Sequence, residues 1–166
     1  MGQPMRDALG EAWFSTLGEP LGAGERADIA AYLQGLGLDA SAAPRLATSW
    51  EEAGILLRGA TGSWWESEEA ERRRLEAAVH LDPADPDWIR LNDLLHGAAA
   101  VAAARCGNSD PGMTRVAAGA ASYAAYHHEL AVLAGCDEAH PFIRKYSLYA
   151  GGRWLLGVYD GRLAIF

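Results

Sequence analysis

Glycine and proline divide this chain into short helical segments that end at defined turns. The chain contains 19 glycines and 7 prolines, and both interrupt helices, glycine through excess backbone freedom and proline through its missing N–H. Asp85-Pro86 and Asp110-Pro111 each place a natural N-cap before a natural first helical residue. We therefore expect several separate helices joined by real turns.

Hydrophobic side chains between these turns recur at three- and four-residue spacing, which is typical of helices with one buried face. Leu91, Leu94, Leu95 and Ala98 show this spacing in the segment that starts at Pro86. The predicted helices span residues 4–17, 24–36, 50–58, 63–80, 86–105 and 111–134, with a short helical turn within 38–48.

The last part of the chain changes to the pattern of strands and tight turns. Asp160-Gly161 between two apolar runs is a strong hairpin signal. In the middle strand, Trp154, Leu156 and Val158 are expected to share one face, because alternate residues of a strand point the same way. Both faces of that strand are apolar and should be covered. The predicted strands span residues 145–149, 153–159 and 162–166.

These patterns predict one domain over residues 1–166, mostly α-helical, with a small C-terminal sheet. About six helices are expected in residues 1–140, and a three-stranded antiparallel β-meander in residues 141–166 should pack on them. By strict count this is an α+β fold. Residues 162–166 are expected to form an outer strand of the meander.

The composition excludes several classes of protein. Hydrophobic residues make up 50% of the chain and charged residues only 22%, which indicates a packed domain rather than disorder. The net charge of −8 argues against nucleic-acid binding, which needs a basic surface, and suits a basic protein partner. The short basic run Arg72–Arg74 is flanked by glutamates at helical spacing, so a solvated helix face is expected there.

No segment points to a membrane or to secretion. The longest apolar run, Gly97–Ala104, is far too short to span a bilayer. We therefore expect a cytoplasmic protein. Cys106 and Cys136 are isolated from each other and form no metal or redox motif, so two free, small buried residues are favoured over a disulfide bridge.

Motifs that would fix a reaction are not found in the sequence. We see no nucleophile elbow, phosphate-binding loop, dinucleotide fingerprint or zinc-protease motif, and no metal ligand set or cofactor is assigned. The aspartates of the Asp82–Asp87 turn resemble a loose calcium loop. However, they lack its glycine and terminal glutamate, and helix capping by Asp85 explains the turn without an ion.

Histidines offer an alternative, catalytic or metal-binding site. Packing of the two long helices against each other could bring some of these imidazoles together for acid–base chemistry. Structural roles are favoured, because adjacent His127 and His128 point about 100° apart on a helix and cannot easily chelate one ion. The alternative site would use His96, His127, His128 and His140.

Two adjacent tryptophans mark a candidate binding surface. Trp64 and Trp65 cannot both face the same core from one helix, so at least one is expected near the surface among acidic residues. An aromatic ring surrounded by carboxylates is a plausible hot spot for a basic partner, although packing on a neighbouring helix explains it equally well. The predicted binding residues are Trp64, Trp65, Glu66, Glu68 and Glu69.

The C-terminal segment carries a family resemblance. Residues His140-Pro141-Phe142, Gly152–Gly157 and Asp160-Gly161 resemble the closing hairpins of small bacterial immunity proteins, which accompany polymorphic toxins. The resemblance implies a non-catalytic inhibitor of a cognate toxin, and it carries over no site residue. The Ala-, Gly- and Arg-rich composition suits a bacterial GC-rich genome. We therefore expect an immunity protein. The alternative is a small enzyme or metal-binding protein that uses the histidines.

Overall fold

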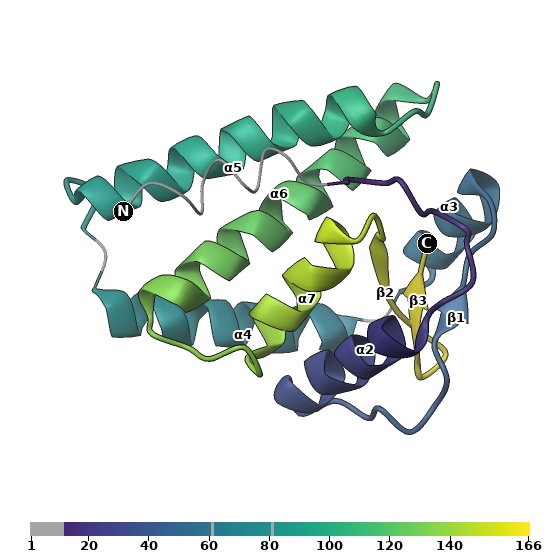
Figure 1. The fold of residues 1–166 in the computed structure, drawn as a ribbon, viewed down its shortest axis with the longest axis horizontal. Coiled ribbons are helices and arrows are strands. Elements are labelled where there is room, and N and C mark those ends of the chain that lie inside the picture. The colour runs from purple at the N-terminus through teal and green to yellow at the C-terminus, as the bar shows by residue number, and fades with distance from the viewer. Residues whose placement is uncertain (1–11, 61, 81) are drawn as a thin grey trace.

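The computed structural model describes residues 12–60, 62–80 and 82–166, and confirms a mostly helical fold with a small sheet (Figure 1). Within these ranges the helices are α2 (Ala23–Gly35), α3 (Trp50–Arg58), α4 (Gly62–Val79), α5 (Pro86–Arg105), α6 (Pro111–Leu133) and α7 (Pro141–Ala150). The strands are β1 (Arg45–Leu46), β2 (Leu155–Tyr159) and β3 (Arg162–Ile165).

Local capping signals place the helix starts. Asp85 accepts a hydrogen bond from the Asp87 amide and Asp110 accepts one from the Gly112 amide, both at 2.8 Å. Each aspartate therefore satisfies an amide that would lack a partner at a helix N-terminus. Both Asp-Pro helix starts predicted from the sequence are confirmed.

Helix α6 crosses the middle of the molecule, with α5 packed along one side and α7 along another (Figure 1). Its buried face is rich in alanine, including Ala117, Ala121 and Ala124. Such small side chains let neighbouring helices approach closely. Helix α2 packs on α7, so the four helices form one layered core.

The three-stranded sheet differs from the predicted meander. Its order is β1-β3-β2, in which β3 pairs antiparallel with β2 and parallel with β1. The sheet is therefore mixed, and β3 is its central strand rather than an outer one. The third strand comes from Arg45–Leu46, inside the segment where a helical turn was predicted.

The predicted strand 145–149 is wrong, because these residues belong to helix α7. His140 caps this helix by accepting a hydrogen bond from the Phe142 amide at 3.2 Å, and Pro141 is its first residue. Phe142, Lys145 and Tyr149 are buried at helical spacing. The alternation of polar and apolar residues in Lys145–Tyr149 is thus part of a helical pattern.

Two further expectations are corrected near the sheet. Of the helix predicted over residues 4–17, residues 4–11 lie outside the described part of the chain, and residues 13–17 form turns with Phe14 at φ +62°. In β2 a bulge at Leu156 interrupts the strict alternation from which one shared face was predicted. Leu155 and Leu156 are both buried, which confirms that both faces of this strand are covered.

Close approach between β2 and α4 requires glycine at residue 157. Gly157 has φ +114°, and a Cβ atom there would lie 2.9 Å from Ala60 Cβ and 3.2 Å from the Trp64 ring. This contact holds the first turn of α4 against the sheet. None of the described helices is long and apolar enough to cross a membrane. Cys106 and Cys136 are both free.

Candidate functional site

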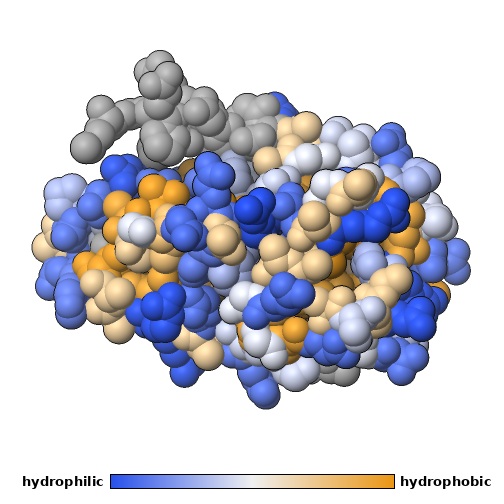
Figure 2. All heavy atoms as spheres, turned by 60° about the horizontal axis from the view of Figure 1, so that its bottom comes forward, coloured by the Kyte–Doolittle hydropathy of each residue, from blue (hydrophilic) through white to orange (hydrophobic). Residues whose placement is uncertain are grey.

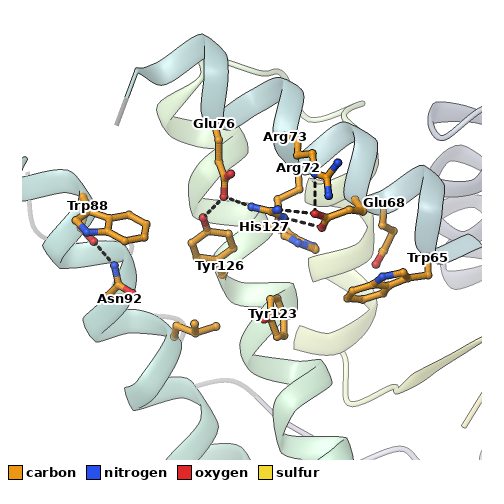
Figure 3. A pocket seen from close by; sticks show the side chains of 12 residues that line it. Trp65, Glu68, Arg72, Arg73, Glu76, Trp88, Asn92, Tyr123, Tyr126 and His127 are labelled. Carbon is orange, nitrogen blue, oxygen red and sulfur yellow. Dashed lines mark hydrogen bonds and ion pairs between the residues drawn. The ribbon is translucent and has the colours of Figure 1, made fainter. Parts of the chain in front are cut away.

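A groove of about 480 Å³ lies between helices α4, α5 and α6 (Figure 3). This volume falls within the range of small-ligand sites. Aromatic and charged side chains line it together. Helix α4 contributes Trp65 and a row of glutamates and arginines, α5 contributes Trp88 and Asn92, and α6 contributes Tyr123, Tyr126 and His127.

Glu68, which lines the groove, belongs to a buried ion pair. Lys145 Nζ on α7 donates to Glu68 Oε1 at 2.6 Å, and the two residues are only 3% and 1% exposed. The same carboxylate oxygen accepts a hydrogen bond from Tyr32 Oη at 2.5 Å, and Tyr32 Oη accepts one from Trp64 Nε1 at 2.6 Å. Burial and the nearby Glu68 carboxylate hold the pKa of Tyr32 well above 10, so this phenol keeps its proton.

The second oxygen of Glu68 has no hydrogen-bond partner among the described residues, although it is buried. Carboxylate oxygens in this situation are rare, because an unmatched buried acceptor costs free energy. Glu68 lines the groove and also a smaller cavity of about 220 Å³, and Trp65 and Tyr123 line both spaces as well. Figure 3 shows Trp65 and Glu68 at one end of the groove and Trp88 and Asn92 at the other, with Tyr123 between them.

His127 lies deep in the groove as a neutral imidazole. Its ring stacks on Phe142 with centroids 4.1 Å apart, and its Nδ1 atom is 3.4 Å from Lys145 Nζ. Burial lowers the pKa of His127 well below 6.5, and the positive charges of Lys145 and Arg72 lower it further. The imidazole therefore adds no positive charge to the groove at neutral pH.

We expect His127 to make the protein less stable in mild acid. The folded pKa lies below the unfolded value of 6.5, so below pH 6.5 the unfolded chain binds a proton that the folded chain does not. The free energy of unfolding should fall by about 1 kcal/mol between pH 7 and 5.5 through this residue. Urea unfolding of wild type and His127→Phe at both pH values measures the difference. An equal loss in both proteins would contradict this role.

The arginines of α4 are already paired within the groove. Arg72 binds Glu69 through Nη2 at 2.6 Å and also contacts Glu76, and Arg73 Nε lies 2.9 Å from Glu69. Hydrogen bonds from Arg72 and Arg73 lower the pKa of Glu69 to about 2. Tyr126 Oη donates to Glu76 at 2.6 Å. These arginines are therefore held by carboxylates, as expected for paired charges on one helix.

The structure does not bring the four candidate histidines together. His96 is exposed, with Nδ1 2.7 Å from the Asn92 carbonyl oxygen. His128 packs on the Tyr146 ring at 4.4 Å, and His140 Nε2 lies 2.8 Å from Glu71 Oε1. Only His127 reaches the groove. Within residues 12–60, 62–80 and 82–166 no group of three possible ligand residues surrounds a metal position.

The Asp82–Asp87 turn, whose sequence resembles a loose calcium loop, is held by hydrogen bonds from backbone amides to its aspartates. Asp82 accepts a hydrogen bond from the Ala84 amide and Asp85 accepts one from the Asp87 amide, both at 2.8 Å. These contacts are those of a turn followed by a capped helix. They account for Asp82 as a turn residue and Asp85 as a helix cap.

The predicted binding residues separate into two groups. Trp65 is 51% exposed, and Glu66 is exposed on the same turn, while Trp64 is half-buried against the sheet. Glu69 is held by the arginines. The prediction for Glu68 is wrong in one respect. This residue was expected among solvated acids and is instead buried. It lies one helical turn after Trp64, on the face of α4 that packs inward.

Lys145 was not among the residues predicted for a site. It is the only lysine in the chain, where all other basic side chains except histidine are arginine. Lysine is seldom buried unless it is paired. A single lysine at helical spacing between Phe142 and Tyr149 was therefore a signal of a specific buried role.

Comparisons with protein-family models, with curated proteins and with solved structures found no match to this chain. Figure 2, which brings the bottom of Figure 1 forward, shows several hydrophobic patches separated by hydrophilic side chains rather than one continuous apolar surface. Interfaces between proteins that also exist apart are about as apolar as the rest of a protein surface, so these patches do not single out one binding face.

Proposed function

We propose that this chain is a non-catalytic inhibitor that binds a basic protein, and specifically a bacterial immunity protein that neutralises a cognate toxin in the cytoplasm. The observation that supports this most is the pair of half-exposed aromatic rings at the groove. Trp65 is 51% exposed and Tyr123 is 44% exposed, and both lie beside the Glu68 carboxylate.

Exposed tryptophan is costly to keep in water and is enriched where partners bind. Trp65 makes its contacts at the groove rather than in the core, whereas neighbouring Trp64 is held by Tyr32. A partner that covers Trp65 would bury a large apolar surface without disturbing the fold. Trp65 is therefore the expected anchor of the interface.

Electrostatics favour a basic partner. The chain has 22 acidic and 14 basic residues, which produce a net charge of −8. A charge of this sign attracts positively charged proteins and raises the rate at which they meet it. The charged side chains that line the groove are nearly balanced, with Glu68, Glu69 and Glu76 against Arg72 and Arg73, so this attraction comes from the net charge of the whole chain.

A second candidate function is a small enzyme that uses the same groove. The observation that favours it is the neutral imidazole of His127 near Glu68, because such a pair can exchange protons with a bound substrate. In that case His127→Phe would abolish turnover of the substrate. For the inhibitor, the wild-type chain binds its partner and shows no turnover for this variant to abolish.

The proposal is tested by measuring whether this protein binds the proteins encoded by neighbouring genes. One of those proteins that is toxic when expressed alone should bind the wild-type chain and lose its toxicity on co-expression. We expect Trp65→Ala to weaken its binding by about 2 kcal/mol, or roughly thirtyfold, measured by titration calorimetry.

Ile55→Ala is the matched control, since Ile55 is 51% exposed but lies on α3 outside the groove. It should bind as tightly as wild type. The proposal is contradicted if no protein encoded by a neighbouring gene binds or is toxic. It is also contradicted if Trp65→Ala and Ile55→Ala bind the partner equally well.

A further inference from the structure

We propose that the groove is a receptor for one guanidinium group, carried by an arginine side chain of the partner, which donates to Glu68 between the rings of Trp65 and Tyr123. This inference rests on the proposed inhibitor function and names the chemistry that the groove recognises. Three features of the groove lead to it: an unmatched acceptor, two available aromatic faces and arginines that are already paired.

The unmatched acceptor requires a donor. Glu68 Oε1 already accepts from Lys145 and Tyr32, while Glu68 Oε2 has no partner among the described residues. The carboxylate is 1% exposed, so bulk water does not solvate it freely. A donor that enters the groove would remove the penalty of this unmatched oxygen, and a charged donor forms the stronger hydrogen bond.

The aromatic side chains select a flat cation. Trp65 and Tyr123 line both the groove and the adjoining cavity together with Glu68, so a group that reaches the carboxylate also meets these rings. A guanidinium group is planar and weakly hydrated, and it stacks on aromatic faces while its edge donates to a carboxylate. An ammonium group can supply the charge but not the planar contact.

The charges beside Glu68 favour a cationic ligand over an anionic one. Arg72 is held by both Glu69 and Glu76, and Arg73, whose side chain is 72% exposed, pairs with Glu69 through Nε. An anion near Glu68 would face an unmatched carboxylate oxygen. The remaining length of the groove, toward Trp88 and Asn92, provides room for the stem and backbone that carry a guanidinium group (Figure 3).

The inference is tested with Nα-acetyl-arginine amide, an arginine side chain without a charged backbone, titrated into the full chain. Because Lys145 is the only lysine, selective lysine labelling places a single NMR side-chain signal next to Glu68. We expect saturable shifts of this signal and of the Trp65 indole signal. The capped citrulline amide has the same shape without the charge, and should bind about tenfold more weakly.

Variants that preserve the fold complete the test. Trp65→Ala removes an exposed ring and should weaken binding of the arginine probe about fivefold. Glu66→Gln removes an exposed carboxylate of the same helix that does not line the groove, and should leave binding within about twofold of wild type if specific contacts rather than net charge decide it. Equal affinity for the two probes, unchanged binding by Trp65→Ala, or no saturable shift would each overturn the inference.

Competition separates this inference from the function on which it rests. A protein partner that binds and displaces the arginine probe supports both. A partner that binds alongside the probe without displacing it leaves the inhibitor function standing and overturns the arginine contact. If the probe binds as expected but no neighbouring product binds, the guanidinium site stands and the inhibitor function fails.

Discussion

Deletion of Arg162–Phe166 is expected to unfold the protein. These residues form the central strand β3 and the last residue after it, and Leu163, Ile165 and Phe166 are each no more than 3% exposed. Losing three buried apolar side chains costs roughly 5 to 8 kcal/mol, which approaches the whole stability of a typical domain. The deletion also leaves β1 and β2 without the strand that joins them.

Thermal melting followed by near-ultraviolet circular dichroism checks this expectation. The shortened chain should show no cooperative transition, whereas Arg162→Ala, a change at an exposed position of the same strand, should melt close to the parent. A shortened chain that melts cooperatively at the parent temperature would show that the sheet is peripheral to the fold.

Breaking the Glu68–Lys145 pair is the second change with a large expected effect. Lys145→Met leaves the Glu68 carboxylate 1% exposed without its cation, and should lower the free energy of unfolding by about 3 to 5 kcal/mol. The double variant Glu68→Gln with Lys145→Met removes both charges and keeps an acceptor for Tyr32. It should recover about 2 kcal/mol or more of that loss.

Urea unfolding of the single and double variants measures these differences. Arg73→Met provides the control, because its ion pair with Glu69 involves a side chain that is 72% exposed and should cost less than about 1 kcal/mol. If Lys145→Met is as stable as wild type, the buried pair does not hold α4 against α7.

Helix starts were predictable because their causes are local. Asp85 and Asp110 each meet their capping partner two residues further along the chain, so the sequence contains the whole interaction. Helix α7 begins with the same device in His140-Pro141, where the histidine ring replaces the aspartate. Recognising histidine as a cap would have corrected the strand predicted over residues 145–149.

The sheet could be predicted only in part, because one of its strands is defined by distant pairing. The β2–β3 hairpin follows from the turn at Asp160-Gly161. Strand β1 has just two residues, and it exists only because Arg45 and Leu46 meet Ala164 and Ile165. A segment this short has no periodicity of its own.

The sequence predicted the exposed tryptophan of the candidate site but not the buried residues behind it. At least one of Trp64 and Trp65 was expected near the surface among acids, and Trp65 is 51% exposed. In the sequence Glu68 resembles its solvated glutamate neighbours. Its burial depends on how α4 is rotated about its own axis relative to α2 and α7. Its partners Tyr32 and Lys145 lie 36 and 77 residues away along the chain, which no local pattern can relate.

The parallel pairing of β1 with β3 also orders the events of folding. The α5–α6 hairpin joins neighbours in sequence and can form early, whereas β3 must find a two-residue partner from the first third of the chain. Closing so large a loop costs entropy before any contact offsets it. We therefore expect the helical layers to assemble first and to hold residues 45–46 in place, so that the C-terminal hairpin docks onto a prepared surface as the slow, final step.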